Sequence, residues 1–165
     1  MKALTIHQPW ASLILLGIKR YENRTWRTNY RGPLAIHAGS SRASWDIAEA
    51  DPAIAADLEQ HGLNRQTAPH GVILGAVWLA DCIGINLIPA DAQSDPYASG
   101  PWCWVLASPT MLQKSLDCSG KLGLWTPQAS SRSQMAKSVS CLEVAVKDTW
   151  LATPADSCSQ VMRQS

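Results

Sequence analysis

Three residues that can do acid–base or anion-binding chemistry stand close together in the chain, namely Lys19, Glu22 and Arg24. A lysine can bind phosphate as a point charge, and a partly desolvated lysine has a lowered pKa and can act as a base. Glu22 can accept a hydrogen bond from an exocyclic amine or take a proton, while Arg24 can hold a phosphate or a base carbonyl. The structural alternative is an ion pair of Glu22 with Lys19 or Arg24. The trio predicts a nucleotide site in which Lys19 and Glu22 are the candidate catalytic pair.

A tryptophan lies in the basic part of the same segment. Trp26 is placed among Arg24, Arg27 and Arg31. An aromatic residue interleaved with cations is typical of a platform on which a base stacks while phosphates are bound. Trp102 follows a predicted flexible loop, and it either closes the cleft over a ligand or packs across the barrel. These residues extend the predicted ligand-binding site beyond the trio.

Further polar residues stand where they could reach the same ligand. His7 and Gln8 precede a predicted apolar helix and would add contacts from the opposite wall of the cleft, with helix capping as the alternative for His7. His37 belongs to a strand beside the motif and is either a general acid or a buried barrel residue. Lys121, in a glycine-rich turn, could touch a backbone phosphate.

Composition narrows the class of protein. With 165 residues the chain has the size of one domain plus a tail, and its net charge of +1 excludes a generally polycationic nucleic-acid coat. Residues 19–31 nevertheless hold five cations against one anion. The five cysteines lack metal-ligand spacing, so we expect no cofactor, no metal and a reducing, cytoplasmic location. The N-terminus has no signal-peptide pattern, and the longest apolar run, residues 13–16, is far too short to span a bilayer. We therefore expect no membrane association.

Short elements must position the residues of the trio. The hydrophobic pattern predicts a strand, a helix, an extended segment and a second strand, at 3–6, 9–17, 18–26 and 34–38. Gly17 is expected to end the helix. Strand alternation places Glu22 and Arg24 on one face of the extended segment and Lys19 on the other.

The pattern after residue 40 predicts two helices, a long strand, a loop and a shorter strand, at 44–50, 52–61, 72–83, 91–101 and 102–106. Ser41 or Ser44 would cap the first helix, and Gly75 would form a bulge in the long strand. Ser108 and Pro109 would end the last strand. Several short strands with helical inserts imply an α+β fold, a mostly β barrel with added helices.

Beyond residue 127 the composition shifts to Ser, Gln and small residues, which predicts a domain over 1–127 and a C-terminal extension over 128–165. The alternating segment 142–146 would add an edge strand, and residues 157–165 are expected to be disordered.

The order of these motifs resembles the ASCH domain, a member of the PUA-like superfamily. The resemblance covers about residues 2–127 and rests on a Gln-Pro-Trp helix start, the signature Gly-x-Lys-x-x-Glu-x-Arg and an Arg-Gly turn, at residues 8–10, 17–24 and 31–32. It implies an α+β fold, a PUA-like β-barrel with short flanking helices. It also implies a cleft between barrel and helices. Members are described as nucleic-acid binders, as nucleases and as amidohydrolases that deacetylate modified cytidine.

Two departures separate the chain from the amidohydrolase members. They carry a threonine where this chain has Glu22, and they draw a second carboxylate from a later helix, where this chain has a loop with Asp91 and Asp95. We therefore expect binding of RNA or a modified nucleotide, with DNA as a further candidate ligand. The alternatives are a metal-independent hydrolase acting on N4-acetylcytidine or RNA, and a regulatory module that binds a protein through exposed aromatic side chains.

Overall fold

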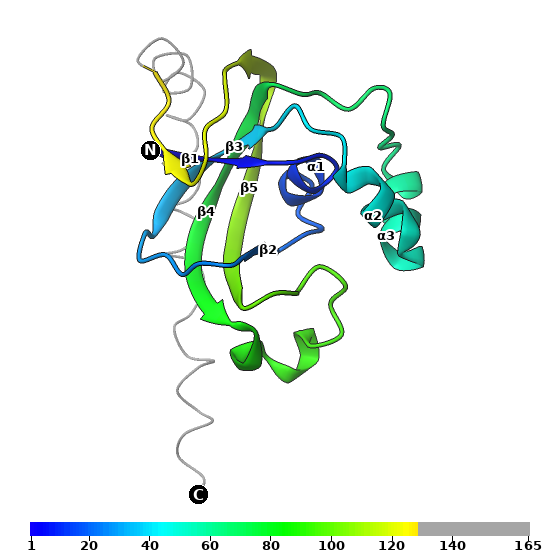
Figure 1. Ribbon diagram of the computed structural model, residues 1–165, viewed down its shortest axis with the longest axis vertical. Coiled ribbons are helices and arrows are strands. Elements are labelled where there is room, and N and C mark those ends of the chain that lie inside the picture. Colours follow the sequence, from blue (N-terminus) through cyan, green and yellow to red (C-terminus); the bar gives the residue numbers. More distant parts are fainter. Residues whose placement is uncertain (129–165) are drawn as a thin grey trace, which may run out of the picture.

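The fold is built on one mixed sheet of six strands. The computed structural model describes residues 1–128, and within them the strands lie in the order β2-β5-β4-β3-β1-β6 (Figure 1). Their bounds are β1 Lys2–Ile6, β2 Tyr21–Arg24, β3 Gly32–Ala38, β4 Val72–Gly84, β5 Trp102–Asp117 and β6 Leu124–Trp125. β1 and β3 are parallel, and the other neighbouring strands are antiparallel. The sheet curls into a half-barrel with a few short helices, which confirms the α+β prediction.

Helix α1 (Trp10–Leu15) fills the hollow of this curled sheet and packs against β3, β4 and β5. Its residues Ile14 and Leu15 share one apolar core with Leu34 and Trp104. The predicted end of the helix is confirmed. Gly17 has a φ of 79°, in the left-handed region that glycine adopts readily, and its N–H donates to the Ile14 carbonyl at 3.0 Å.

Two further helices, α2 (Ser44–Ala50) and α3 (Pro52–Gln60), pack beside α1 around a second apolar cluster that includes Leu13 and Trp45. Asp51 begins α3, because its side chain accepts hydrogen bonds from the N–H groups of Ala53 at 2.9 Å and Ile54 at 3.3 Å. Both predicted helices are therefore present beside the sheet (Figure 1).

The predicted cap of α2 is wrong. Ala43 is the N-cap and makes no side-chain cap hydrogen bond, while Ser44 is already helical. Ala43 has a helical backbone, with φ −64° and ψ −24°, whereas a capping serine needs an extended conformation to aim its hydroxyl at the first N–H groups. Ser41 accepts only from the N–H of Ala43, before the helix begins.

β5 is longer than predicted, because it continues through Ser108 and Pro109 instead of ending there. On either side of these two residues the register pairs are Trp78↔Ala107 and Ala76↔Thr110. β5 therefore has one residue more than β4 between the two pairs, which makes a bulge. Ser108 takes a φ of 48° in this bulge, and Pro109, which has no N–H, lies where the ladder is interrupted. The bulge predicted at Gly75 is confirmed in the ladder with β3, where the register pairs Ile36↔Gly75 and His37↔Ile73 leave Leu74 as an extra residue of β4.

The segments between the strands also depart from prediction. The extended segment predicted over 18–26 is shorter, since β2 spans Tyr21–Arg24. Two short 3₁₀ helices, η1 (Ile85–Leu87) and η2 (Ala90–Ala92), lie between β4 and β5. The edge strand predicted at 142–146 and the tail at 157–165 fall outside the described residues. In residues 1–128, no helix has the length and apolar character needed to cross a bilayer.

Candidate functional site

β2 carries the centre of the candidate site. It pairs antiparallel with the start of β5, in a register that puts Glu22 opposite Trp104. Glu22 and Arg24 project from the same face of this strand, as strand alternation requires. The Glu22 Oε1 lies 2.9 Å from Arg24 Nη2, which also donates to the Thr5 carbonyl on β1 at 3.1 Å. Arg24 is thus held by one carboxylate and one backbone oxygen.

Lys19 joins this pair through a bend that precedes β2. The N–H groups of Ile18 and Lys19 both donate to the Leu13 carbonyl, so the chain turns back on α1 before it becomes extended. As a result Lys19 Nζ lies 3.7 Å from Glu22 Oε2, although a continuous strand would have put the two on opposite faces. Glu22 therefore forms both of the ion pairs that its position in the sequence suggested.

Lys19 is almost fully enclosed, with 4% of its surface exposed. Its ammonium donates to the carbonyls of Tyr21 and Tyr97 and lies about 6 Å from the ring centres of Trp10 and Tyr97. Burial lowers the pKa of Lys19, and the negative charge of Glu22 opposes that shift. Glu22 is 6% exposed, so both members of the candidate catalytic pair are buried.

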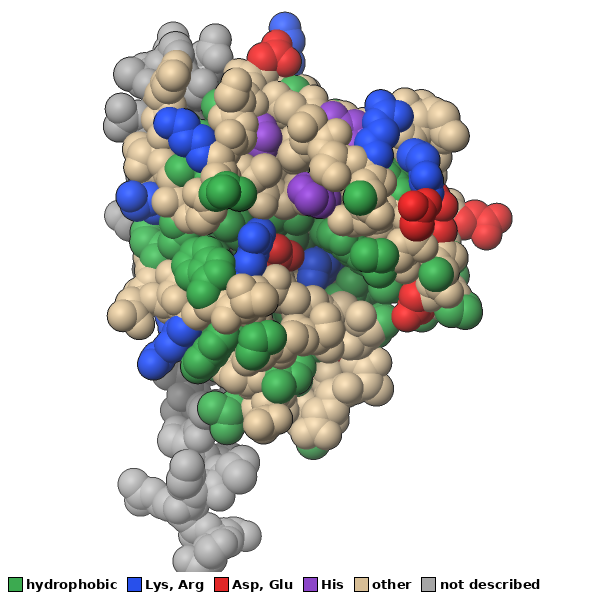
Figure 2. Space-filling model, in the orientation of Figure 1, with side chains coloured by type: hydrophobic (Ala, Val, Ile, Leu, Met, Phe, Trp, Pro, Cys, Tyr) green, Lys and Arg blue, Asp and Glu red, His purple; other side chains and the backbone are tan. Residues whose placement is uncertain are grey.

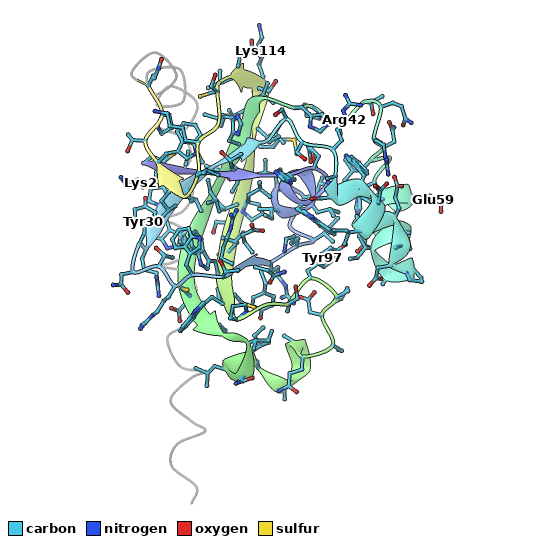
Figure 3. All side chains as sticks on the ribbon, viewed as in Figure 1. Lys2, Tyr30, Arg42, Glu59, Tyr97 and Lys114 are labelled. Carbon is cyan, nitrogen blue, oxygen red and sulfur yellow. The ribbon has the colours of Figure 1, made fainter. Side chains whose placement is uncertain are left out.

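The loop between β4 and β5 covers the Lys19 side of the site, and two residues that sequence reasoning missed hold it there, Tyr97 in the loop and Asn23 on β2. Tyr97 donates its hydroxyl to Asp57 on α3 at 2.6 Å, and Figure 3 shows Tyr97 in the space between β2 and the α2–α3 pair. Asn23, on the opposite face of β2 from Glu22, donates to the Tyr97 carbonyl at 2.9 Å and accepts from the Ser99 N–H at 3.0 Å. No periodicity in the loop sequence signals these contacts.

Aromatic and cationic residues meet at the other end of β2. Trp26 is 36% exposed and stands edge-on to Trp104, with ring centres 4.7 Å apart. The Arg27 guanidinium lies 5.6 Å from the ring centre of Trp102, which is half-buried at the start of β5. We call Trp26, Arg27 and Trp102 the platform. It leaves a tryptophan and an arginine open to solvent.

Two predicted ligand contacts are instead occupied by other groups. Gln8 is 0% exposed, and its amide bonds the Pro69 carbonyl at 3.0 Å and the Ser12 N–H at 3.1 Å. Arg31 forms an ion pair of 2.6 Å with Asp81 on β4. The structure thus brings neither side chain together with the trio.

Both candidate histidines line the same groove in the surface. His7 is exposed, with its Nδ1 3.3 Å from the Ser44 hydroxyl. His37 is buried, and its Nε2 donates to the Cys118 carbonyl at 2.7 Å, so in the neutral ring Nδ1 carries no proton, and it makes no hydrogen bond within residues 1–128. Both side chains line the groove together with Arg24.

The buried His37 should make folding stability depend on pH. Burial lowers the pKa of His37, and the bond to Cys118 opposes that shift. At a pH between the His37 pKa of the folded chain and that of the unfolded chain, the unfolded chain binds more protons than the folded one. The stability that is present above about pH 6.5 is therefore lost as the pH falls through the folded pKa. We expect the free energy of unfolding to decrease between about pH 7 and pH 5, and His37→Gln to flatten this decrease in urea denaturation. An unchanged slope in His37→Gln would contradict the assignment, and exposed His61→Gln is the control.

The surface view shows how these groups meet solvent. Figure 2 shows a hollow near the middle of this face, with acidic atoms between basic atoms at its bottom and hydrophobic side chains on its flanks. We call the space around Lys19, Glu22 and Arg24 the cleft. In residues 1–128 no group of three or more His, Cys, Asp or Glu side chains is placed to hold a metal ion.

Comparisons with known proteins identify the family of this chain. The ASCH domain family model matches residues 4–114, which include the cleft and the platform. The chain belongs to the ASCH family. The predicted resemblance is thereby confirmed, and the ASCH family is associated with RNA binding.

Curated relatives and solved structures are also similar to this ASCH domain. It is 38% identical over 124 residues to human activating signal cointegrator 1, and 40% identical over 81 residues to the mouse protein. These matches cover 74% and 48% of this chain, but only 21% and 14% of the two relatives. Crystal structures of ASCH from Zymomonas mobilis and of a tyrosine-to-phenylalanine mutant of that protein each give a TM-score of 0.47 at 10% identity. They cover 82% of this chain and 93% and 96% of theirs.

Proposed function

We propose that this ASCH domain binds single-stranded RNA, with one nucleotide held between Arg24 in the cleft and Trp26 on the platform. The observation that carries the proposal is the way Arg24 is held. Glu22 and the Thr5 carbonyl both bond its Nη2, while about a quarter of its side chain stays exposed, at 23%. A guanidinium fixed by a buried carboxylate is preorganised for a phosphate or a base carbonyl.

The platform supplies the second half of this recognition. Trp26 offers an exposed indole whose position is fixed by the edge contact with Trp104 and by the Trp104 Nε1 donating to the Trp26 carbonyl at 3.4 Å. An unpaired base can stack on such a ring, whereas the bases of a duplex are already stacked on one another. Arg27 lies next to this surface and can neutralise a phosphate.

Binding is better supported than hydrolysis, although the lowered pKa of Lys19 would suit a general base. Both carboxylate oxygens of Glu22 face cations, and the Lys19 ammonium is held by two backbone carbonyls. Neither residue is free to attack a substrate or to activate water, and both are nearly inaccessible. The contacts of Lys19 and Glu22 are those of a scaffold that holds Arg24.

The salt dependence of RNA binding tests this proposal. Anisotropy of a labelled single-stranded RNA of about ten nucleotides should show an affinity that falls as salt rises, because phosphate contacts release counterions. Arg27→Gln should weaken binding about three- to tenfold and lower the salt slope by about one. Arg31→Gln is the matched control and should change neither value, because Arg31 is paired with Asp81.

Three results would count against the proposal. RNA affinity independent of salt would mean that the cations do not contact phosphate. Equal affinity of the wild-type chain and Arg27→Gln, with both proteins folded, would remove the platform from the binding surface. Turnover of RNA or N4-acetylcytidine by the pure chain, lost in Lys19→Met, would favour the hydrolase.

A further inference from the structure

A second concave surface begins where the cleft ends. It has a volume of about 1050 Å³ and is lined by Thr5, His7, Arg24, Asp117, Lys121 and Thr126, among others. We call it the side groove. Arg24 is paired with Glu22 in the cleft and also lines the side groove, so the two surfaces share this side chain. The volume exceeds the roughly 300–1000 Å³ of pockets that enclose a drug-sized ligand, so one nucleotide would not fill the combined surface.

The side groove is bounded by the segment that connects β5 to β6, which leads from the end of β5 to β6 beside β1 (Figure 1). Its charged lining consists of Arg24 and Lys121 against the single acid Asp117, with His7 at its edge. Its polar lining also includes the hydroxyl groups of Thr5, Ser40, Ser41, Ser119 and Thr126 and the side chains of His37 and Gln128. Cations and hydroxyls distributed along an open groove are suited to a phosphodiester backbone, whose charges repeat along its length.

The connecting segment is held firmly at its base. The Thr5 hydroxyl donates to the Lys121 carbonyl at 3.0 Å and accepts from the Trp125 Nε1 at 3.2 Å. Gly120 packs so closely on His37 that an added Cβ would lie 2.6 Å from the imidazole Cε1. A side chain at this position would therefore push the segment away from β1 and β3.

The side chains at the tip of the segment point away from this anchor. Lys121 is exposed, and Leu122 is 99% exposed. The anchored backbone therefore holds a cation and an apolar side chain at the rim of the groove without using either in packing. Because little further ordering of the backbone is needed, a contact made there loses less entropy than one on a free loop.

We propose that the side groove binds the phosphodiester backbone of the nucleotides that flank the one in the cleft, with Lys121 as a phosphate contact and Leu122 against an adjoining base. The inference rests on the proposed function and specifies its ligand. The partner is a single-stranded RNA several nucleotides long, and a free nucleotide fills only part of the surface.

The length of the RNA tests the inference with the full 165-residue chain. Labelled RNAs of about three and about ten nucleotides are compared by anisotropy. The longer RNA should bind at least about tenfold tighter. Lys121→Ser should weaken only the longer RNA, about three- to tenfold, and lower its salt slope by about one. Lys114→Ser is the matched control, because Lys114 is exposed on β5 (Figure 3) and does not line the side groove.

The outcomes separate this inference from the proposed function. If Lys121→Ser binds the longer RNA as tightly as the wild-type chain while Arg27→Gln weakens both RNAs, the side groove is overturned and the platform stands. If the wild-type chain binds neither RNA, both proposals fail. A labelled DNA of about ten nucleotides is measured as well. If Lys121→Ser weakens the binding of this DNA but not of the RNA of the same length, the assignment to RNA is overturned.

Discussion

Replacing Trp26 by leucine should weaken the binding of single-stranded RNA by about ten- to hundredfold. The stacking of a base on an aromatic side chain contributes about 1–3 kcal/mol, and leucine has no π face. Leucine can still pack on Trp104, whose ring centre is 4.7 Å from that of Trp26. The loss should therefore appear in affinity measured by anisotropy, with little change in the free energy of unfolding.

Trp26→Tyr is the matched variant, because tyrosine keeps an aromatic face at the same place. Its affinity should stay within about threefold of the wild-type value. If the tyrosine and leucine variants bind equally well, the indole of Trp26 does not stack on a base. If both variants lose affinity together with stability, Trp26 acts through the packing around Trp104.

Replacing Glu22 by glutamine should reduce the free energy of unfolding by about 3–5 kcal/mol. The substitution keeps the shape of the side chain but removes its charge, and the amide has a single oxygen acceptor where the carboxylate gives one oxygen to Lys19 and one to Arg24. Urea denaturation measures the loss. The control is Asp81→Asn, because the Asp81–Arg31 pair is largely solvent-exposed and should contribute less than about 1 kcal/mol.

The pH dependence of Glu22→Gln gives a second readout. Burial lowers the pKa of Lys19, and Glu22 opposes that shift, so removing the carboxylate lowers this pKa further. An ammonium whose folded pKa is depressed makes the native state more stable as pH rises from the folded pKa toward the unfolded one. Stability should therefore increase more steeply above neutral pH in Glu22→Gln than in the wild-type chain. Identical slopes would mean that Lys19 does not depend on Glu22.

Local patterns were sufficient to predict the elements that carry the site. The apolar spacing before Gly17 predicted α1, and the short, mostly apolar run at 34–38 predicted β3, which is buried on both faces. The family signature pointed to Lys19, Glu22 and Arg24, and the structure brings these three side chains together. What the sequence could not provide was the partner of β2, which is β5, some 80 positions later in the chain.

Contacts between distant segments account for most of what was missed. Tyr97 reaches Lys19 only because Asn23 and Asp57 hold the loop before β5, and each bond joins residues from different elements. Arg31 looked like part of a basic stripe, yet the pairing of β3 with β4 places Asp81 beside it. Gln8 precedes a helix as a polar ligand would, but the chain around Pro69 buries it. Charge and spacing along the chain do not reveal such neighbours.

The hydrogen bond from Arg24 to Thr5 spans the open side of the half-barrel. β2 is one edge of the sheet, while β1 lies near the other, next to β6. A closed barrel would join its edges by a backbone ladder, whereas here a side chain on β2 reaches a carbonyl on β1. A ligand that accepts the hydrogen bond which Arg24 now donates to the Thr5 carbonyl would break this contact between the two edges. We therefore expect ligand binding at Arg24 to loosen the contact between the two edges, and hydrogen exchange at the β2 amides should then become faster.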